Sequence, residues 1–187
     1  RKNLMYNTVG ISDIYPTDLD GDSDVDLVWP NYEFDRVVWL ENDGTGGMKN
    51  VYTISNAADG ATSVYAVDLD GDGDDDVLSA ARWDNKIAAY ENKITGEGGT
   101  GGFGNEVIIS NSVDWAGGVY SFDVDNDGDN DILSSSERYD KTTWYENIDS
   151  GGFGGGEVIE STSQGEQTLR AADLDGDGDR DLLSASQ

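Results

Sequence analysis

Short apolar stretches separated by polar turns run through the whole sequence. Between residues 62 and 110 such stretches cover residues 62–67, 76–82, 86–91 and 106–110, and they are rich in Val, Ile, Tyr and Ser. Each has the length of a β-strand and is too short for an ordinary helix. The segment between the second and third stretches is tight and polar, as a β-hairpin turn requires. The pattern therefore predicts four antiparallel strands in this part of the chain.

This four-stretch pattern is repeated along the chain. A motif of alternating aspartates begins at residues 18, 68, 123 and 173, so that successive copies start 50, 55 and 50 residues apart. Two landmarks keep a constant distance from the motif. One is a following Glu-Asn pair at residues 41–42, 91–92 and 146–147, and the other is a preceding apolar residue at Leu4, Ile54, Ile109 and Ile159. The spacing varies only in Gly-rich segments such as 95–104 and 150–156, which we expect to be surface loops.

Four antiparallel strands in each repeat are typical of a β-propeller blade. We therefore predict an all-β fold, a single β-propeller over residues 1–187 with three full blades at 11–55, 61–110 and 116–161. Partial blades are expected at each end: one last strand at 1–6 and two first strands at 168–187. A plain β-sandwich would not explain the constant spacing. Since propellers close with about four to eight blades, we expect part of a larger propeller or an assembly-completed ring.

The composition narrows the possible partners. The chain has 39 acidic and 11 basic residues and a formal charge of -28, which disfavours nucleic acids and anionic membrane surfaces and favours divalent cations. It has no cysteine and no histidine, which excludes disulfides, thiol chemistry, histidine catalysis and the usual zinc sites. No apolar segment is long enough for membrane insertion. Five Trp and nine Tyr argue against disorder.

The aspartate motif itself predicts a metal site. In Asp173-Leu-Asp-Gly-Asp-Gly-Asp-Arg-Asp181, five carboxylates alternate over nine residues. Calcium takes six to eight oxygen ligands, and we expect the side chains at positions one, three, five and nine and the backbone carbonyl at position seven to supply them. Magnesium is a poorer match because it requires strict octahedral geometry. We expect about four calcium sites, one per loop, from Asp18, Asp20, Asp22, Asp24, Asp26, Asp68, Asp70, Asp72, Asp74, Asp76, Asp123, Asp125, Asp127, Asp129, Asp131, Asp173, Asp175, Asp177, Asp179 and Asp181.

Two details of the motif modify this prediction. Ser23 replaces the glycine at position six of the first loop, and a serine with positive φ is strained, so we expect this site to be the weakest or the most distorted. An EF-hand is excluded because it needs flanking helices and a glutamate at position twelve. That position holds Trp29, Ser79, Ser134 and Ser184.

The motif Asp-x-Asp-Gly-Asp-Gly-Asp-x-Asp followed by Leu-Leu-Ser-Ala, with Trp-Tyr-Glu-Asn elsewhere in the repeat, resembles the FG-GAP/VCBS repeat family. This family is related to the calcium-binding blades of integrin α-subunit propellers. The resemblance covers essentially the whole chain. It implies calcium held between the first and second strands of each blade. It also implies an extracellular or cell-surface location and roles in adhesion, surface recognition or carbohydrate-active proteins.

The aromatic residues divide into two groups. Trp39, Trp144, Tyr90 and Tyr145 recur at equivalent strand positions, which favours packing between blades. The other group lies at non-equivalent positions and is expected on an exposed binding surface: Trp29, Trp83, Trp115 and Tyr139.

Three functions remain open at this point. The leading prediction is a calcium-stabilised, non-catalytic extracellular module for binding, adhesion or assembly, with a glycan or protein ligand. The first alternative is the propeller or accessory module of a polysaccharide-degrading enzyme. The second is a structural building block that self-associates through open blade edges.

Overall fold

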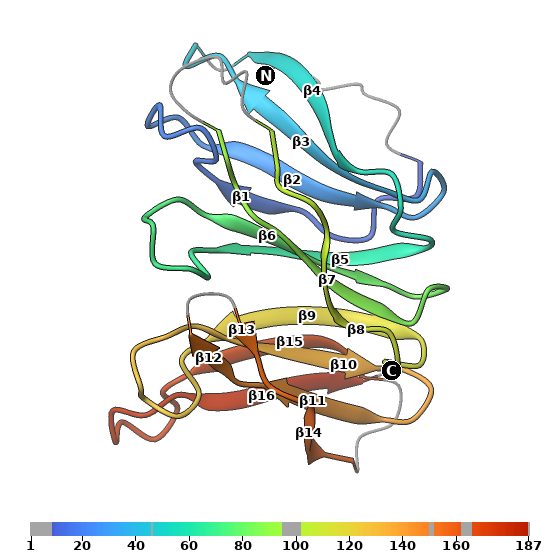
Figure 1. The fold of residues 1–187 in the computed structure, drawn as a ribbon, viewed down its shortest axis with the longest axis vertical. Helices are drawn as coiled ribbons and strands as arrows, with labels where there is room; N and C mark the ends of the chain where they lie inside the picture. The colour runs from blue at the N-terminus through green and yellow to red at the C-terminus, as the bar shows by residue number, and fades with distance from the viewer. Residues whose placement is uncertain (1–8, 46, 95–101, 150–151, 162–165, 187) are drawn as a thin grey trace.

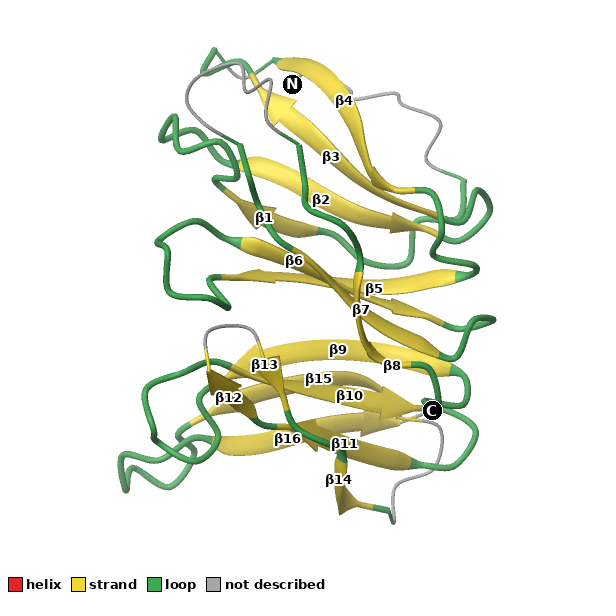
Figure 2. Cartoon of the chain, in the orientation of Figure 1, coloured by secondary structure: helices red, strands yellow, loops and turns green. Residues whose placement is uncertain are grey.

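The computed structural model describes residues 9–45, 47–94, 102–149, 152–161 and 166–186. Within these ranges it contains antiparallel β-sheets and no helix (Figures 1 and 2). The predicted all-β fold built from four-stranded blades is confirmed. The strand expected at residues 1–6 and most of the Gly-rich segment 95–104 lie outside the described residues.

Three four-stranded sheets, here called blades 1 to 3, follow one another along the chain. Blade 1 consists of β1 (Tyr15–Thr17), β2 (Asp26–Asn31), β3 (Arg36–Asn42) and β4 (Met48–Ser55). Blade 2 consists of β5 (Ala61–Val67), β6 (Asp76–Ala81), β7 (Lys86–Tyr90) and β8 (Val107–Ser110). Blade 3 consists of β9 (Ala116–Phe122), β10 (Asp131–Ser136), β11 (Lys141–Tyr145) and β14 (Glu157–Glu160). The two-stranded sheet that follows, half-blade 4, consists of β15 (Glu166–Ala172) and β16 (Asp181–Ser186).

The blades stack face to face along the long axis of the molecule (Figure 1). Their first strands meet, so that β5 contacts β9 and β9 contacts β15. Because successive side chains of a strand point to opposite faces, a sheet with neighbours on both sides buries both sets. Every residue of β6 and β7 in blade 2 is accordingly buried, whereas the outer strand β8 is largely exposed. Apolar clusters between the blades thus form the core of the protein.

The aromatic residues expected between blades lie there, with Trp39, Tyr90 and Tyr145 buried in these clusters. Trp144 packs, partly buried, against the cluster between blade 3 and half-blade 4. The expectation of an exposed Trp29 is wrong, because this side chain is only 6% exposed. It lies in an apolar cluster on blade 1, where β2 and β3 place it beside Val38.

A small hairpin occupies part of a segment that we expected to be loop. The strands β12 (Asn147–Asp149) and β13 (Gly152–Phe153) pair with each other, and residues 154–156 continue as loop. Phe153 lies opposite Asn147 and packs against the core between blades 2 and 3. The partial burial of this aromatic side chain stabilises the hairpin. In the described residues no helix could serve as a membrane span.

Candidate metal sites in four aspartate loops

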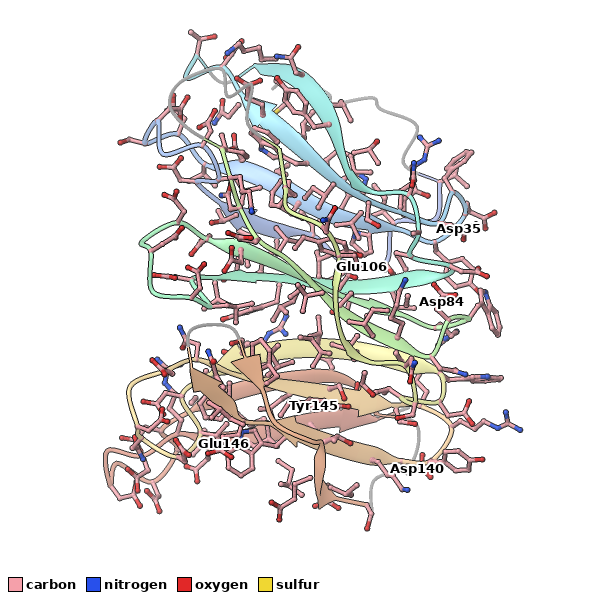
Figure 3. All side chains as sticks on the ribbon, viewed as in Figure 1. Asp35, Asp84, Glu106, Asp140, Tyr145 and Glu146 are labelled. Atoms are coloured by element: carbon pink, nitrogen blue, oxygen red, sulfur yellow. The ribbon has the colours of Figure 1, made fainter. Side chains whose placement is uncertain are left out.

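Each aspartate motif connects the first and second strands of its blade. We call them loop 1 (residues 18–26), loop 2 (68–76), loop 3 (123–131) and loop 4 (173–181). All four lie along the same edge of the stacked blades, on the left in Figures 1 and 2. The hairpin turns between the second and third strands lie on the opposite edge, where Figure 3 labels Asp35, Asp84 and Asp140. The acidic loops therefore form one row.

The backbone of each loop bends through positive φ at positions four and six. These positions hold Gly21 and Ser23, Gly71 and Gly73, Asn126 and Gly128, and Gly176 and Gly178. At position six the glycines have φ between 98° and 104°, whereas Ser23 has φ 75°. A Cβ added at Gly73 would meet no atom within 4 Å, so the preference for glycine comes from the backbone angle and not from crowding. The positive φ predicted for Ser23 is confirmed.

The aspartate at position one holds the bend from inside. In loop 2, the Asp68 carboxylate accepts hydrogen bonds from the backbone N–H groups of Gly71 at 2.7 Å and Gly73 at 3.0 Å. Asp18 and Asp173 accept equivalent bonds in their loops. Asp123 accepts bonds from the N–H groups of Asp127 and Gly128, at positions five and six. A carboxylate has about four acceptor sites, so these bonds leave room for a cation. The alternating spacing thereby turns several carboxylates toward the inside of one loop.

Three carboxylates gather in every loop. One oxygen from each lies within 4.8 Å of the others, in the groups Asp18–Asp20–Asp22, Asp68–Asp70–Asp76, Asp123–Asp125–Asp127 and Asp173–Asp175–Asp181. Each group could hold a metal ion. The remaining predicted side-chain ligands lie in the same loops but outside these groups: Asp26, Asp72, Asp131 and Asp177. The side chains at position seven, where we expected a carbonyl ligand, also lie outside them: Asp24, Asp74, Asp129 and Asp179.

Asp20 gives the strongest indication that one of these loops binds a cation. Its side chain is 5% exposed, and among the described residues neither carboxylate oxygen accepts a hydrogen bond of normal geometry. Burial, and after it the charge of Asp26, raises the pKa of Asp20 to about 6. A buried carboxylate without partners is costly, and a cation bound between Asp18, Asp20 and Asp22 would compensate it. The chemistry of this loop therefore fits a hard cation.

The aspartate at position nine also accepts structural hydrogen bonds from the backbone, which were not predicted from the sequence. Asp76 is 4% exposed and accepts hydrogen bonds from the backbone N–H groups of Leu69 at 3.1 Å and Asn92 at 2.8 Å. Burial raises its pKa to about 6. Asp26 and Asp131 accept the same pair of bonds in blades 1 and 3. This residue therefore ties its loop to the end of the third strand.

The asparagine of each Glu-Asn pair, to which we assigned no function, lies at this junction. The side-chain amide of Asn147 in blade 3 donates to the carbonyl of Leu69 in loop 2 at 2.9 Å and to that of Asn130 in loop 3 at 3.1 Å. The Asn130 amide in turn donates to the Asp68 carbonyl at 3.1 Å. Neighbouring loops are thus joined directly. The constant distance of the Glu-Asn pair from the motif was the signal for this contact.

The opposite edge carries the remaining aromatic candidates. Trp83 is 50% exposed, Trp115 is 39% exposed and Tyr139 is 56% exposed. Trp83 and Trp115 contact each other edge to face, with their ring centroids 5.9 Å apart. The acidic loops and the exposed aromatic residues therefore occupy different edges of the molecule.

Known proteins share the repeat and the fold of this chain. A family model described as FG-GAP-like repeat matches residues 18–79, 68–134 and 123–184. A solved lectin from Agrocybe aegerita, described by its specific recognition of non-reducing terminal N-acetylglucosamine, is 19% identical with a TM-score of 0.61, over 90% of this chain and 45% of that chain. The V. cholerae biofilm matrix protein Bap1 is 18% identical with a TM-score of 0.49, over 91% of this chain and 27% of that chain. This chain thus spans less than half of either structure. No curated protein matches it.

Proposed function

Since this chain belongs to the FG-GAP-like repeat family, we propose that it is a calcium-stabilised extracellular β-propeller module that binds or adheres and does not catalyse. The observation that supports this most directly is the buried Asp20 carboxylate, which has no hydrogen-bond partner and lies beside Asp18 and Asp22. Calcium suits these loops better than magnesium, because they offer many oxygen ligands and flexible geometry.

In the proposed sites, the side chains at positions one, three, five and nine and the carbonyl at position seven surround the ion. The ion would offset the repulsion among carboxylates that share one short loop. It would also fix the loop between two strands, so that binding free energy becomes folding free energy. One site contributes about 2.7 kcal/mol when free calcium exceeds its Kd a hundredfold.

The extracellular location follows from the same proposal. Calcium modules outside cells work with Kd values of about 10⁻⁴–10⁻³ M, and their sites are filled only where calcium is abundant. Two of the four loops, loops 3 and 4, have largely exposed carboxylates, as in loop 4, where Asp173 and Asp175 lie at the surface. Loops of this kind suit a calcium-rich environment.

The binding role draws support from the fold and from the aromatic edge. The fold resembles that of a lectin whose description names a sugar ligand. In this chain, Trp83, Trp115 and Tyr139 expose large rings on one edge. Exposed aromatic residues are enriched where proteins bind ligands and partners.

Thermal melting in calcium, in EGTA and in magnesium tests the calcium proposal. We expect EGTA to lower Tm by ten degrees or more, calcium to restore it fully, and magnesium to restore it only in part. An unchanged Tm in EGTA would contradict the proposal.

A matched pair of variants locates the effect in loop 1. Asp20→Asn removes a buried charge, so we expect a higher Tm than wild type in EGTA but a smaller gain from calcium. Asp24→Asn changes a side chain outside the carboxylate group and should keep the wild-type calcium gain. Equal calcium gains in both variants would show that the Asp20 side chain does not bind the ion.

A further inference from the structure

Trp115 stands where the other repeats carry glycine. Eight residues before each loop the sequence has Gly10, Gly60, Trp115 and Gly165. The first three of these have φ of 81°, 65° and 56°. In each case the carbonyl accepts a hydrogen bond from the following hairpin turn: from Tyr32 at 2.9 Å, Arg82 at 3.0 Å and Glu137 at 3.0 Å. The same left-handed turn is therefore built three times, and in blade 3 a tryptophan occupies it.

The backbone of Trp115 is strained, yet its side chain is not buried. A bulky residue with positive φ costs about 1–3 kcal/mol and is found mainly at functional sites. The Trp115 side chain remains 39% exposed, and it lies edge to face with Trp83. The guanidinium groups of Arg82 and Arg138 lie 5.6 Å and 5.9 Å from its ring centroid. Core packing alone does not account for a tryptophan at this turn.

A polar cavity opens beside this cluster. Its volume is about 250 Å³, and its lining includes Asp13, Tyr32, Arg82, Gly118 and Glu137. Arg82 joins the cavity to Trp115, because its guanidinium pairs with Glu137 and also faces the indole ring. The Arg82 Nε atom is buried and makes no hydrogen bond within the described residues. Tyr32, from the cavity wall, contacts Trp83 at a centroid distance of 6.1 Å.

The charged side chains around the cavity indicate which class of ligand it could bind. Arg82 pairs with Glu137, and Arg138 lies 3.6 Å from Asp114. The lining carries two basic residues, Arg82 and Arg170, and two acidic ones, Asp13 and Glu137, so it offers no net positive charge to an anion, which the charge of -28 would also repel. A cationic ligand is disfavoured as well, because the guanidinium groups of Arg82 and Arg138, which lie beside Trp115, would repel it. What remains is a neutral molecule with an apolar face for the rings and hydroxyl groups for the paired polar side chains.

We propose that the cavity beside Trp115 and Arg82 binds a neutral saccharide. One face of a sugar ring presents C–H groups that suit the negative face of an indole, and its hydroxyls would bond to Arg82, Glu137 and Asp13. Binding pockets for drug-sized ligands measure about 300–1,000 Å³, so a cavity of about 250 Å³ suits one sugar residue. This inference rests on the proposed binding function and assigns it a site and a ligand class.

The test uses calcium-saturated protein on an array of neutral glycans that end in glucose, galactose, mannose, N-acetylglucosamine or N-acetylgalactosamine, followed by calorimetric titration with the best one. Trp115→Gly installs the residue that the other repeats carry, so its Tm should equal or exceed that of wild type. Its affinity should fall at least tenfold. Phe34→Ala removes another exposed aromatic of the same edge, outside the cavity lining, and should bind as wild type does.

The possible results separate this inference from the proposed function. Tenfold weaker binding in Trp115→Gly with an unchanged Tm supports the site. Binding within twofold of wild type in that variant, or binding of anionic glycans alone, overturns it. If no neutral glycan binds, the inference also fails, whereas the calcium-dependent Tm still decides separately whether the module is calcium-stabilised.

Discussion

The side-chain amide of Asn92 donates a hydrogen bond to the carbonyl of Leu19, 2.8 Å away and 73 positions earlier in the chain. Asn92 follows the third strand of blade 2, and Leu19 lies in loop 1 of the neighbouring blade. The same amide donates to the Asp75 carbonyl at 3.0 Å, and the Asn92 backbone N–H donates to Asp76 at 2.8 Å. One buried residue therefore holds two candidate metal loops in place.

We expect Asn92→Ala to lower the free energy of unfolding by about 2–4 kcal/mol, because it removes two hydrogen bonds and leaves buried carbonyl groups without a donor. Urea denaturation in saturating calcium measures the loss. The control is Asn42→Ala at the same repeat position, where the amide donates to Val25 within its own, more exposed loop. Equal losses in the two variants would show that the hydrogen bond between blades stabilises the protein no more than the one within a blade.

The sequence predicted the fold well because the repeat constrains it at every level. Strand-length apolar stretches, a polar turn and a constant spacing all indicated the same blade. The contact of Asn92 with Leu19 could not be predicted in this way, since one sequence by itself does not show which residues of different repeats lie close together. Its only trace in the sequence was the constant position of Asn42, Asn92 and Asn147.

A reciprocal exchange at position six tests the strain in loop 1. Ser23→Gly should stabilise the protein by about 0.5–1 kcal/mol, because relief of the left-handed conformation exceeds the extra entropy that glycine loses on folding. Gly73→Ser should destabilise loop 2 by a similar amount, since the added side chain meets open space and only the backbone is strained. Chemical denaturation in calcium compares both with wild type. Changes of the same sign in the two variants would contradict this explanation.

The metal-free protein should become less stable as pH rises from 5 to 7. Burial raises the pKa of Asp20 and of Asp76 to about 6, above the ordinary value of 3.8. The folded state therefore binds more protons than the unfolded state in this range, and the stability from these groups is lost as pH passes through about 6. In calcium the trend should reverse, because the ion binds the ionised carboxylates.

Melting curves from pH 5 to 7 in EGTA and in calcium measure both trends. The double variant Asp20→Asn, Asp76→Asn should have a clearly shallower slope in EGTA. The rest of the slope comes from Asp26, Asp70 and Asp131, whose pKa burial also raises. A wild-type Tm that rises with pH in EGTA would show that these two carboxylates do not control the stability of the metal-free protein.

The candidate site was predictable in its residue types and less so in its geometry. The alternating aspartates indicated a metal loop, but their spacing could not show that Asp20 would be buried and Asp173 exposed. That difference depends on what covers each loop. Trp29 and Trp115 illustrate the same limit, because both differ from the residues at equivalent positions of the other repeats. Strand register buries Trp29, whereas a strained turn leaves Trp115 exposed.

Hydrogen bonds also make each inner loop depend on the blades beside it. The amides of Asn130 and Asn147 reach back to Asp68 and Leu69, just as Asn92 reaches back to Leu19. In these contacts the donor always belongs to the later blade and the acceptor to the earlier loop. Thr17 at the end of β1 donates in the other direction, to Asp75 in loop 2. Loop 2 therefore depends on both neighbouring blades, and damage to either of them should loosen it.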